Sequence, residues 1–251
     1  DITGITTNEK LADQYASNCV LALPLVGSAG DVSASITCTS STKTATAQGN
    51  AAASSEQSVF YGGSFEFDGT TDYISVSDHN DLDGFSDFTI EFWFNCSTIG
   101  GAEVLLSKGY DGNYAPYLFY NNSSDKLLFY ASSSNSSWDV ASAIEFGDSA
   151  ELLNKWHHIA VTREGSTGRL FLDGVQRSTF SNGSTLHANS GSVTIFSRDS
   201  GAAAPIGYCQ DVRFYKGVAK YTSDFVVPSR SPDILPDTPS GVSGSSKLTK
   251  I

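Results

Sequence analysis

Two adjacent histidines, His157 and His158, follow Trp156 in the stretch NKWHHIAVTREGSTGRLFLDGVQ of a chain that has only four histidines. Imidazole binds metal ions and exchanges protons near neutral pH, so the pair raises the question of a metal or catalytic site. In an extended strand, however, neighbouring side chains point to opposite faces. The two rings therefore cannot converge on one metal ion. We interpret the pair as structural, with His157 on the face of Ile159 and His158 on the face of Trp156.

Other familiar catalytic patterns are absent from the sequence. No GxSxG motif positions a nucleophilic serine, and no cysteine–histidine spacing fits zinc. The glycine-rich stretches YGGSF and GSTG do not lead from a strand into a helix, as a phosphate-binding loop must. Serine hydrolase chemistry, zinc binding and nucleotide binding are therefore unsupported.

Sugar binding is a chemistry for which the sequence does supply candidates. A sugar site needs an aromatic ring for the apolar face of the sugar and nearby amide or carboxylate groups for its hydroxyls. The stretches GYDGNYAPY and NSSWDV contain both kinds of group in expected loops. Packing of these aromatic rings on the body of the fold is the alternative, and the sequence leaves it open. The candidate carbohydrate-binding residues are Tyr110, Asp111, Asn113, Tyr114 and Trp138.

Four cysteines, Cys19, Cys38, Cys96 and Cys209, allow three complete disulfide pairings. Burial as small apolar side chains is one interpretation of most of them. One or two structural disulfides in an oxidising compartment is the other. Cys19 and Cys38 are close enough in sequence to meet, so we predict a Cys19–Cys38 bridge as the first candidate.

The charge of the chain argues against several classes of partner. Lys and Arg number 15 against 27 Asp and Glu, which gives a net charge of −12 at pH 7. Such a charge repels phosphate backbones and anionic membranes, so no nucleic-acid partner is expected. No apolar run reaches the roughly 18 residues of a membrane helix, so no membrane insertion is expected. Because Met is absent, we expect a processed product or a piece of a longer polypeptide.

The elements that must position these residues are β-strands. The stretch FTIEFWF (88–94) alternates aromatic and aliphatic residues on one face and carries bulk on the other, which predicts a central strand. The stretch SFEFDGTTDYISV (64–76) predicts a hairpin that turns at Asp68-Gly69. Further apolar stretches of strand length follow, separated by Gly, Asn and Ser, without a useful helical period. The pattern predicts an all-β fold, an antiparallel two-sheet β-sandwich.

The chain is expected to divide into three segments. Residues 1–17 form a polar N-terminal segment, 18–228 form the sandwich, and 229–251 form a Pro/Ser-rich linker or tail. Within the sandwich, 28–58 is Ser/Thr/Ala-rich and predicts a long connection with two weak strands. The prolines of the tail fix φ and remove N–H donors, so we expect it to run extended. Its apolar residues, Ile234, Leu235 and Val242, are expected to be buried by a partner or a following domain.

Four stretches occur in a characteristic order: FEFDGTTDYISV, DFTIEFWF, WHHIAVTREGSTGRLFLDGVQ and GYCQDVRFYKGVAKYTSDFVVP. This ordered set resembles the laminin-G-like branch of the concanavalin A-like jelly rolls, over roughly Cys19 to Pro228. The last stretch is similar to the version of this domain that occurs in virion proteins of marine bacteriophages. The resemblance implies two curved antiparallel sheets with the first and last strands adjacent. Members of the family bind glycans or proteins, or serve as structural modules.

The resemblance also indicates which catalytic motif to look for. Glucanases on this fold carry an ExDxxE strand motif that supplies a nucleophile and a general acid. In EFDGTT, Glu66 and Asp68 share a face, but Thr71 stands where the second Glu should be. Without a second correctly spaced carboxylate the two-carboxylate mechanism fails, so we predict that the protein is not an enzyme.

Calcium is a further expectation from the resemblance. Laminin-G-like domains often hold one Ca²⁺ with Asp side chains and backbone carbonyls, which are the hard oxygen ligands that calcium prefers. No DxDxDG loop is present, and turn-forming aspartates in an acidic surface are the alternative. We therefore expect no cofactor other than a calcium ion without assigned ligands. The loop aspartates are Asp68, Asp72, Asp78, Asp81, Asp83 and Asp111.

These observations predict a non-enzymatic structural or adhesion module of a phage virion, in capsid decoration, the tail or a fibre. The expected location is the virion surface. The expected partners are other virion proteins or copies of itself, with host-surface glycans as further ligands. The alternative is a glycan-binding domain of a secreted or cell-surface bacterial adhesin. A glucanase-like hydrolase is the least favoured interpretation.

Overall fold

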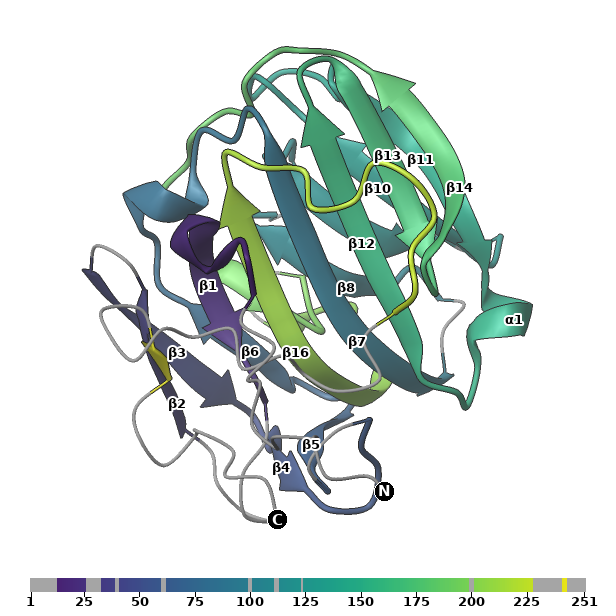
Figure 1. The fold of residues 1–251 in the computed structure, drawn as a ribbon. Coiled ribbons are helices and arrows are strands. Elements are labelled where there is room, and N and C mark those ends of the chain that lie inside the picture. Colours follow the sequence, from purple (N-terminus) through teal and green to yellow (C-terminus); the bar gives the residue numbers. More distant parts are fainter. Residues whose placement is uncertain are drawn as a thin grey trace, which may run out of the picture.

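The computed structural model describes residues 13–25, 33–38, 41–59, 62–98, 101–110, 113–122, 124–198, 201–227 and 241–242. Within these residues the chain forms two antiparallel sheets packed face to face, which confirms the predicted β-sandwich (Figure 1). The first sheet, sheet A, has the order β14 (Val175–Ser181), β13 (Thr167–Leu172), β12 (His157–Glu164), β7 (Phe88–Thr98), β16 (Ile206–Lys216), β5 (Ser64–Asp68) and β4 (Ala52–Ser54), and β1 (Cys19–Leu23) also pairs with β16.

The second sheet, sheet B, packs against sheet A. Its strands follow the order β11 (Ala141–Asp148), β10 (Lys126–Ala131), β9 (Tyr117–Asn121), β8 (Val104–Lys108), β15 (Val193–Ile195), β6 (Tyr73–Val76), β3 (Ser41–Gln48), β2 (Ser33–Cys38) and β17 (Gly241–Val242). The Ser/Thr/Ala-rich stretch supplies β2 and β3, as predicted, and also β4; the long connection predicted for 28–58 is wrong, because most of these residues form strands. The short helices of the described residues are η1 (Ala16–Asn18), η2 (Asn80–Leu82) and α1 (Ser149–Leu152). None of the helices among them is long and apolar enough to cross a membrane.

Strand β7 is central, as its sequence predicts, because it pairs with β12 on one side and β16 on the other. Its residues Phe88, Ile90, Phe92 and Phe94 are fully buried between the sheets. Across the sandwich, the ring of Phe92 contacts that of Phe119 edge to face, with centroids 5.3 Å apart. Edge-to-face geometry suits the ring quadrupoles and adds to the stabilisation from apolar burial. The first and last long strands, β1 and β16, are neighbours, as the resemblance implies.

The outer face of sheet A is covered by residues 217–227, which we call the strap. Figure 1 shows the strap as the yellow segment that crosses β7 and β12. The ammonium of Lys220 lies 2.5 Å from the Glu91 carboxylate, and the Tyr221 hydroxyl donates to the same carboxylate at 2.8 Å. The Tyr221 ring stacks on Phe225 with centroids 3.6 Å apart. Burial acts to raise the pKa of Glu91, but Lys220 and His158 outweigh it and hold this pKa well below its usual range.

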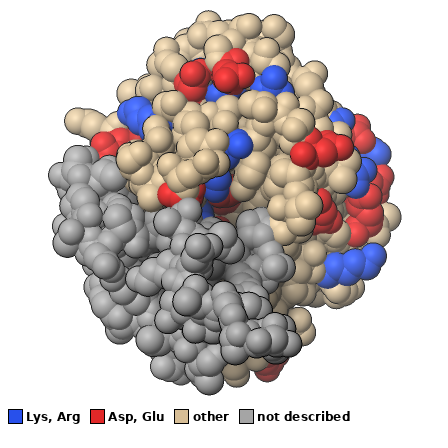
Figure 2. All heavy atoms as spheres, viewed as in Figure 1, with Lys and Arg blue, Asp and Glu red and all other residues tan. Residues whose placement is uncertain are grey.

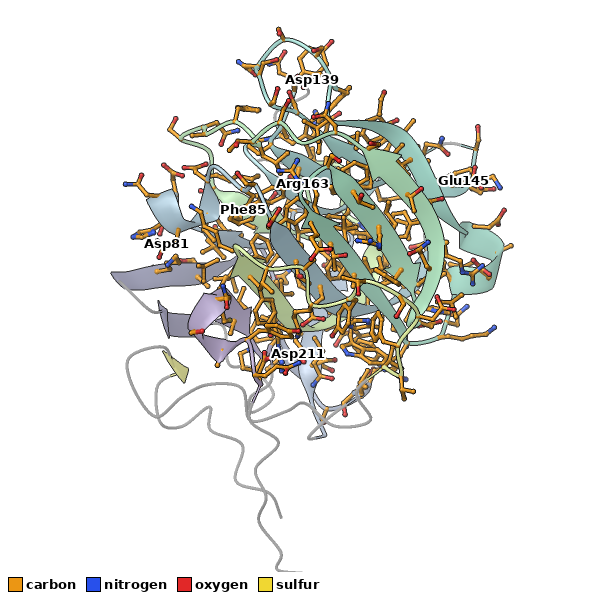
Figure 3. The ribbon with its side chains drawn as sticks, turned by 45° about the horizontal axis from the view of Figure 1, so that its top comes forward. Asp81, Phe85, Asp139, Glu145, Arg163 and Asp211 are labelled. Atoms are coloured by element: carbon orange, nitrogen blue, oxygen red, sulfur yellow. The ribbon has the colours of Figure 1, made fainter. Side chains whose placement is uncertain are left out.

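Arg163 is a second buried charge, and its hydrogen bonds connect segments that are far apart in the sequence. Its side chain is 0% exposed and lies over the ring of Phe88. The guanidinium donates to the carbonyl oxygens of Ser86, Phe85 and Ser184 at 2.5, 2.8 and 2.7 Å. Figure 3 shows Arg163 reaching toward Phe85 from β12. One side chain of the TREG stretch therefore joins the loop before β7 to the loop after β14.

The described cysteines are buried, Cys96 and Cys209 in the core of the sandwich and Cys19 in a separate cluster with Ala22 and Tyr215. Cys96 and Cys209 are buried thiols on the neighbouring strands β7 and β16. Burial raises the pKa of both thiols, and each stays neutral at physiological pH. Cys19 is buried on β1, whereas the side chain of Cys38 lies outside the described residues. The Cys19–Cys38 bridge therefore stays a prediction.

The two ends of the chain are largely outside the described residues. This applies to residues 1–12 and to most of the tail, including Ile234 and Leu235, so their expected burial by a partner stays untested. Val242 is part of β17, which pairs with β2 and places Val242 opposite Ile36 of the same chain.

Candidate functional site

Five partly exposed aromatic side chains gather on the outer face of sheet B and its adjoining loops. We call them the aromatic cluster: Tyr110, Tyr114, Tyr120, Tyr130 and Trp138. The ring of Trp138 lies 5.1 Å from that of Tyr130, 5.3 Å from that of Tyr114 and 6.3 Å from that of Tyr110. Tyr120 extends the cluster, with its ring 6.3 Å from that of Tyr130. Trp138 is therefore the centre of the cluster.

Two members of the cluster, Tyr120 and Tyr130, face outward because side chains alternate between the two faces of strands β9 and β10. Phe119 and Phe129 point into the core, so the next residues along each strand, Tyr120 and Tyr130, point outward. Tyr120 stands opposite Leu128 in the register, and Tyr130 stands opposite Leu118. Directly opposite residues share a face, so both leucines lie on this outer face. They are only 5% and 2% exposed, and they form an apolar base beside the tyrosine rings.

Trp138 is carried by a loop that its neighbours hold in place. The Asp139 carboxylate accepts a hydrogen bond from the Ser133 amide at 2.8 Å, and the Ser132 hydroxyl donates to the Ser137 carbonyl at 2.6 Å. Burial acts to raise the pKa of Asp139, but the hydrogen bonds from Ser133 outweigh it and lower this pKa. Asn182 donates to the Asp139 carbonyl at 2.8 Å and anchors the loop to the end of β14. Asp139, visible at the top of Figure 3, therefore holds the loop that presents Trp138.

The structure brings three of the predicted sugar-binding residues, Tyr110, Tyr114 and Trp138, into one cluster. Asn113 is exposed in the same loop, and Asp111 lies outside the described residues. Tyr120 and Tyr130 were not among the predicted sugar-binding residues. Their signal was the alternation in YLFYNN and KLLFYASS, where each Tyr follows a core Phe. The involvement of any of these residues in sugar binding stays a prediction.

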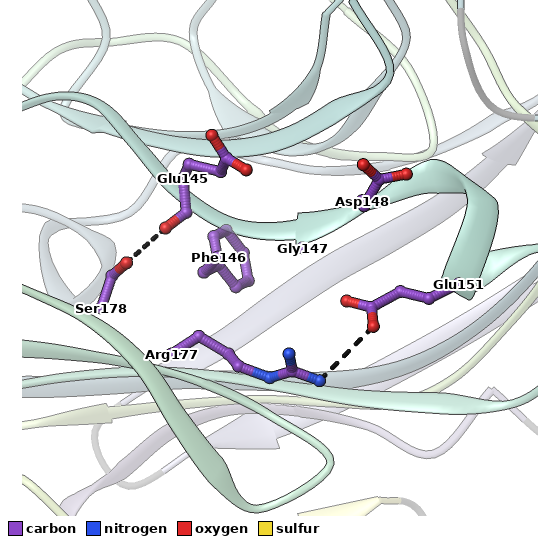
Figure 4. A pocket seen from close by; sticks show the side chains of 7 residues that line it. All are labelled: Glu145, Phe146, Gly147, Asp148, Glu151, Arg177 and Ser178. Atoms are coloured by element: carbon purple, nitrogen blue, oxygen red, sulfur yellow. Dashed lines mark hydrogen bonds and ion pairs between the residues drawn. The ribbon is translucent and has the colours of Figure 1, made fainter.

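A polar groove of about 540 Å³ lies where the edge strands of the two sheets, β11 and β14, approach each other (Figure 4). Its lining residues are Glu145, Phe146, Gly147, Asp148, Glu151, Arg177 and Ser178. The Arg177 guanidinium lies 3.6 Å from the Glu151 carboxylate. At the rim, the Lys126 ammonium lies 2.9 Å from Asp148 and 3.1 Å from Glu145. The groove therefore presents hydrogen-bond donors and acceptors together.

The two adjacent histidines have separate structural roles. His157 Nδ1 lies 2.7 Å from the Asp173 carboxylate, at the turn between β13 and β14. His158 Nε2 lies 3.6 Å from the Glu91 carboxylate, beneath the strap. Because each ring packs on a different face of β12, the pair does not form a common metal site, as the strand argument predicts.

The carboxylates of EFDGTT do not continue into a third acidic position. Strand β5 ends at Asp68, and Thr71 lies in the following turn with a φ of 66°. The Tyr208 hydroxyl contacts Glu66 at 3.3 Å and Glu56 at 3.2 Å. Burial and these two carboxylates raise the pKa of Tyr208 to about 12. Because Thr71 stands in the turn where the glucanases have their second Glu, β5 lacks the ExDxxE arrangement of the glucanases.

Several of the aspartates considered for calcium are already bound by lysines. The Lys43 ammonium lies 2.6 Å from Asp81, and that of Lys108 lies 2.5 Å from Asp78 and 3.5 Å from Asp83. Both lysine side chains are fully buried. Across the described ranges, no group of three or more His, Cys, Asp or Glu side chains could hold a metal ion. Calcium binding thus stays an expectation without ligands.

The other described candidates, Asp68 and Asp72, serve the turn between β5 and β6. The predicted hairpin over 64–76 is wrong, because this turn carries the chain from sheet A to sheet B: β5 pairs with β4 and β16, and β6 pairs with β3 and β15. Asp72 accepts hydrogen bonds from the amides of Asn50 and Asp68 at 2.5 and 2.9 Å, and Asp68 accepts one from Thr70 at 2.7 Å. Asp111 lies outside the described residues. These bonds are typical of turn-forming aspartates.

We expect calcium to have little effect on the stability of the domain. A ligand that binds only the folded state raises the melting temperature, and Ca²⁺ at about a hundredfold excess over its dissociation constant would add about 2.7 kcal/mol, which is a shift of several degrees. Because the buried ammonium groups of Lys43 and Lys108 already pair with Asp78, Asp81 and Asp83, melting curves in excess Ca²⁺ and in EDTA should coincide. A reproducible increase with Ca²⁺, but not with Mg²⁺, would contradict this expectation.

The surface charge agrees with the composition. On the face shown in Figure 2, Lys and Arg side chains lie among Asp and Glu side chains, and the described part of this face carries no continuous basic patch. Phosphate backbones are bound by clustered basic side chains, and the expectation of no nucleic-acid partner stays a prediction.

Comparison with known proteins identifies the sandwich. The family model for the concanavalin A-like lectin/glucanases superfamily, Laminin_G_3, matches residues 68–220. No curated protein matches the chain. The binding domain of Paraclostridial Mosquitocidal Protein 1 is similar in structure, with a TM-score of 0.56 and 14% identity, over 81% of this chain and 50% of that chain. The receptor binding domain of botulinum neurotoxin D gives a TM-score of 0.59 and 12% identity, over 80% of this chain and 50% of that chain.

A smaller protein is similar over most of its length. Domain 4 of AbnA, a GH43 extracellular arabinanase from Geobacillus stearothermophilus, was solved in complex with arabinotriose. It gives a TM-score of 0.53 and 13% identity, over 72% of this chain and 84% of that chain. This chain spans about half the length of the two toxin domains. At such low identity, all three similarities show a shared fold.

Proposed function

This chain belongs to the concanavalin A-like lectin/glucanases superfamily, and we propose that it is a non-enzymatic carbohydrate-binding module whose site is the aromatic cluster around Trp138. The observation that carries the proposal is the gathering of five partly exposed rings on one face, beside a loop that is fixed by hydrogen bonds. Aromatic side chains that remain exposed in a group are typical of binding surfaces, because water exposure of apolar rings is unfavourable.

The chemistry of the cluster suits sugars. Ring faces pack on the C–H groups of a sugar, and the tyrosine hydroxyls can donate to or accept from its hydroxyls. The outer face of sheet A differs, because the strap covers it over Glu91. The domain of AbnA solved with arabinotriose supports the proposal, since it has the same fold.

The non-enzymatic part of the proposal rests on the residues that catalysis would need. Thr71 lies in a turn where glucanases have a second carboxylate, and both His157 and His158 contact carboxylates of the scaffold. We expect no turnover of β-glucans. A measurable rate that disappears in Glu66→Gln would contradict this part and leave sugar binding in place.

A glycan array with the whole chain tests the proposed function directly. We expect binding to a small group of related glycans, confirmed by titration calorimetry with a soluble hit. The same array probed with Trp138→Ala should show no signal above background. If the unaltered protein binds no glycan at millimolar concentration, or if Trp138→Ala binds as well as the unaltered protein, the proposed site is wrong.

We further propose that the module is carried on the surface of a phage virion, where it contacts other virion proteins or copies of itself. The similarity of GYCQDVRFYKGVAKYTSDFVVP to domains of marine phage virion proteins supports this setting. Mass spectrometry of purified virions should detect peptides of this chain at a fixed copy number. Detection only in bacterial envelope or secreted fractions would favour the adhesin alternative.

A further inference from the structure

The aromatic cluster and the polar groove lie on one continuous strip of sheet B. In the strand register, Tyr120 of β9 stands opposite Leu128 of β10, and Leu128 stands opposite Glu145 of β11. Directly opposite residues share a face, so all three side chains lie on the outer face. Neighbouring strands are about 4.8 Å apart, which places Glu145 about 10 Å from Tyr120. Because Glu145 also lines the groove, the groove begins where the aromatic strip ends.

The groove offers hydrogen-bonding groups rather than aromatic surfaces for stacking. Its one aromatic residue, Phe146, is 3% exposed and packs in the core. Arg177 and Glu151 are each 41% exposed, so the guanidinium and the carboxylate remain accessible beside their ion pair. Glu145 is also accessible at the rim, where it meets Lys126. Hydroxyl groups both donate and accept, and can therefore bind to this mixed set.

Charge and size restrict the ligand further. The carboxylates of Glu145, Asp148 and Glu151 outnumber the cations of Lys126 and Arg177, so an anionic sugar would meet a net negative charge. The groove volume of about 540 Å³ falls within the range of roughly 300–1,000 Å³ that is typical of small-molecule sites. The groove is thus large enough for part of a saccharide.

We infer that the glycan is a neutral oligosaccharide that crosses strands β9, β10 and β11, with one part on the aromatic cluster and another in the groove between β11 and β14. This inference rests on the proposed function, since it assigns the ligand class and a second subsite to that site. Trp138 and its neighbouring rings bind the sugar face at one end. Glu145, Glu151 and Arg177 bind hydroxyls at the other end.

Titration calorimetry with a size series tests the inference. The probes are the monosaccharide and successively longer neutral oligomers of the unit found on the glycan array. Affinity should increase about tenfold or more from the monosaccharide to an oligomer that reaches the groove, which is about 1.4 kcal/mol, because the longer ligand adds hydrogen bonds to charged groups. Arg177→Ala should remove about this factor for the long oligomer and leave monosaccharide binding unchanged.

Two further variants separate the possible results. Lys155→Ala removes an exposed cation that does not line the groove, so it should bind every probe as the unaltered protein does. Trp138→Ala should lose both short and long probes. If Trp138→Ala loses binding while chain length and Arg177→Ala have no effect, the groove is not a subsite and the proposed function stands. A preference for carboxylated or sulfated sugars would also overturn the inference. If no sugar binds at all, the proposed function fails together with the inference.

Discussion

Replacing Arg163 by methionine is expected to lower the free energy of unfolding by about 3–5 kcal/mol. The guanidinium donates to the buried carbonyl of Phe85 and to the partly buried carbonyls of Ser86 and Ser184, and methionine fills similar space without any donor. A buried carbonyl without a donor costs about 1–3 kcal/mol, and here one buried and two partly buried carbonyls lose their charged donor together. Urea unfolding monitored by tryptophan fluorescence would measure the loss as a lower midpoint with an unchanged slope.

Arg177→Met is the matched control for this measurement. Its guanidinium is 41% exposed and makes a single ion pair at 3.6 Å, so the same substitution should cost less than about 1 kcal/mol. Arg163→Lys keeps the positive charge but replaces the planar guanidinium by a single ammonium group. Its loss of unfolding free energy should therefore lie between those of Arg163→Met and Arg177→Met. Equal and small losses for Arg163→Met and Arg177→Met would show that the loops on either side of Arg163 are held by other contacts.

Trp138→Ala is expected to weaken glycan binding by more than tenfold, which is the largest effect on binding that we predict. Burying a large aromatic side chain against a ligand contributes about 1.5–3 kcal/mol, and every 1.4 kcal/mol is a factor of ten. The fold should be retained, because Trp138 lies on the outer face and outside the buried core. Calorimetric titration with a soluble glycan, together with melting curves for both proteins, would measure the two effects separately.

The control for Trp138→Ala is a partly exposed aromatic residue outside the cluster. Tyr208 lies on β16 of sheet A, next to Glu56 and Glu66. Tyr208→Ala should leave the glycan affinity unchanged. If Tyr208→Ala and Trp138→Ala weaken binding equally, the sugar contacts sheet A or the effect comes from unfolding, and the site is not the aromatic cluster.

The two outer faces of the sandwich differ in how they are covered. On sheet A the strap places the ammonium of Lys220 against Glu91, which gives a buried charge a partner and a hydrogen bond. On sheet B the tyrosine and tryptophan rings remain accessible. The strap thus stabilises the outer face of sheet A, and the proposed sugar site lies on the outer face of sheet B.

Part of this arrangement could be predicted from the sequence because it depends on local alternation. Side chains alternate with a period of two in a strand, so the stretch FTIEFWF alone determines that Phe92 and Phe94 share a buried face. The same rule determines that the side chains of His157 and His158 point to opposite faces of β12, and it excludes a shared metal site. The turn after Asp68, and the absence of a third carboxylate, follow from residues that are adjacent in the chain.

Only the tertiary structure decided which distant residues meet. Tyr120, Tyr130 and Trp138 come from two strands and a loop, and their contacts depend on the pairing of β9 with β10. Likewise, Lys108 reaches Asp78, and Arg163 reaches loops on both sides of it. No local pattern encodes these contacts, because strand register and sheet packing bring together residues that are far apart in sequence. The groove between β11 and β14 exists for the same reason, since its two walls meet only when the sheets pack.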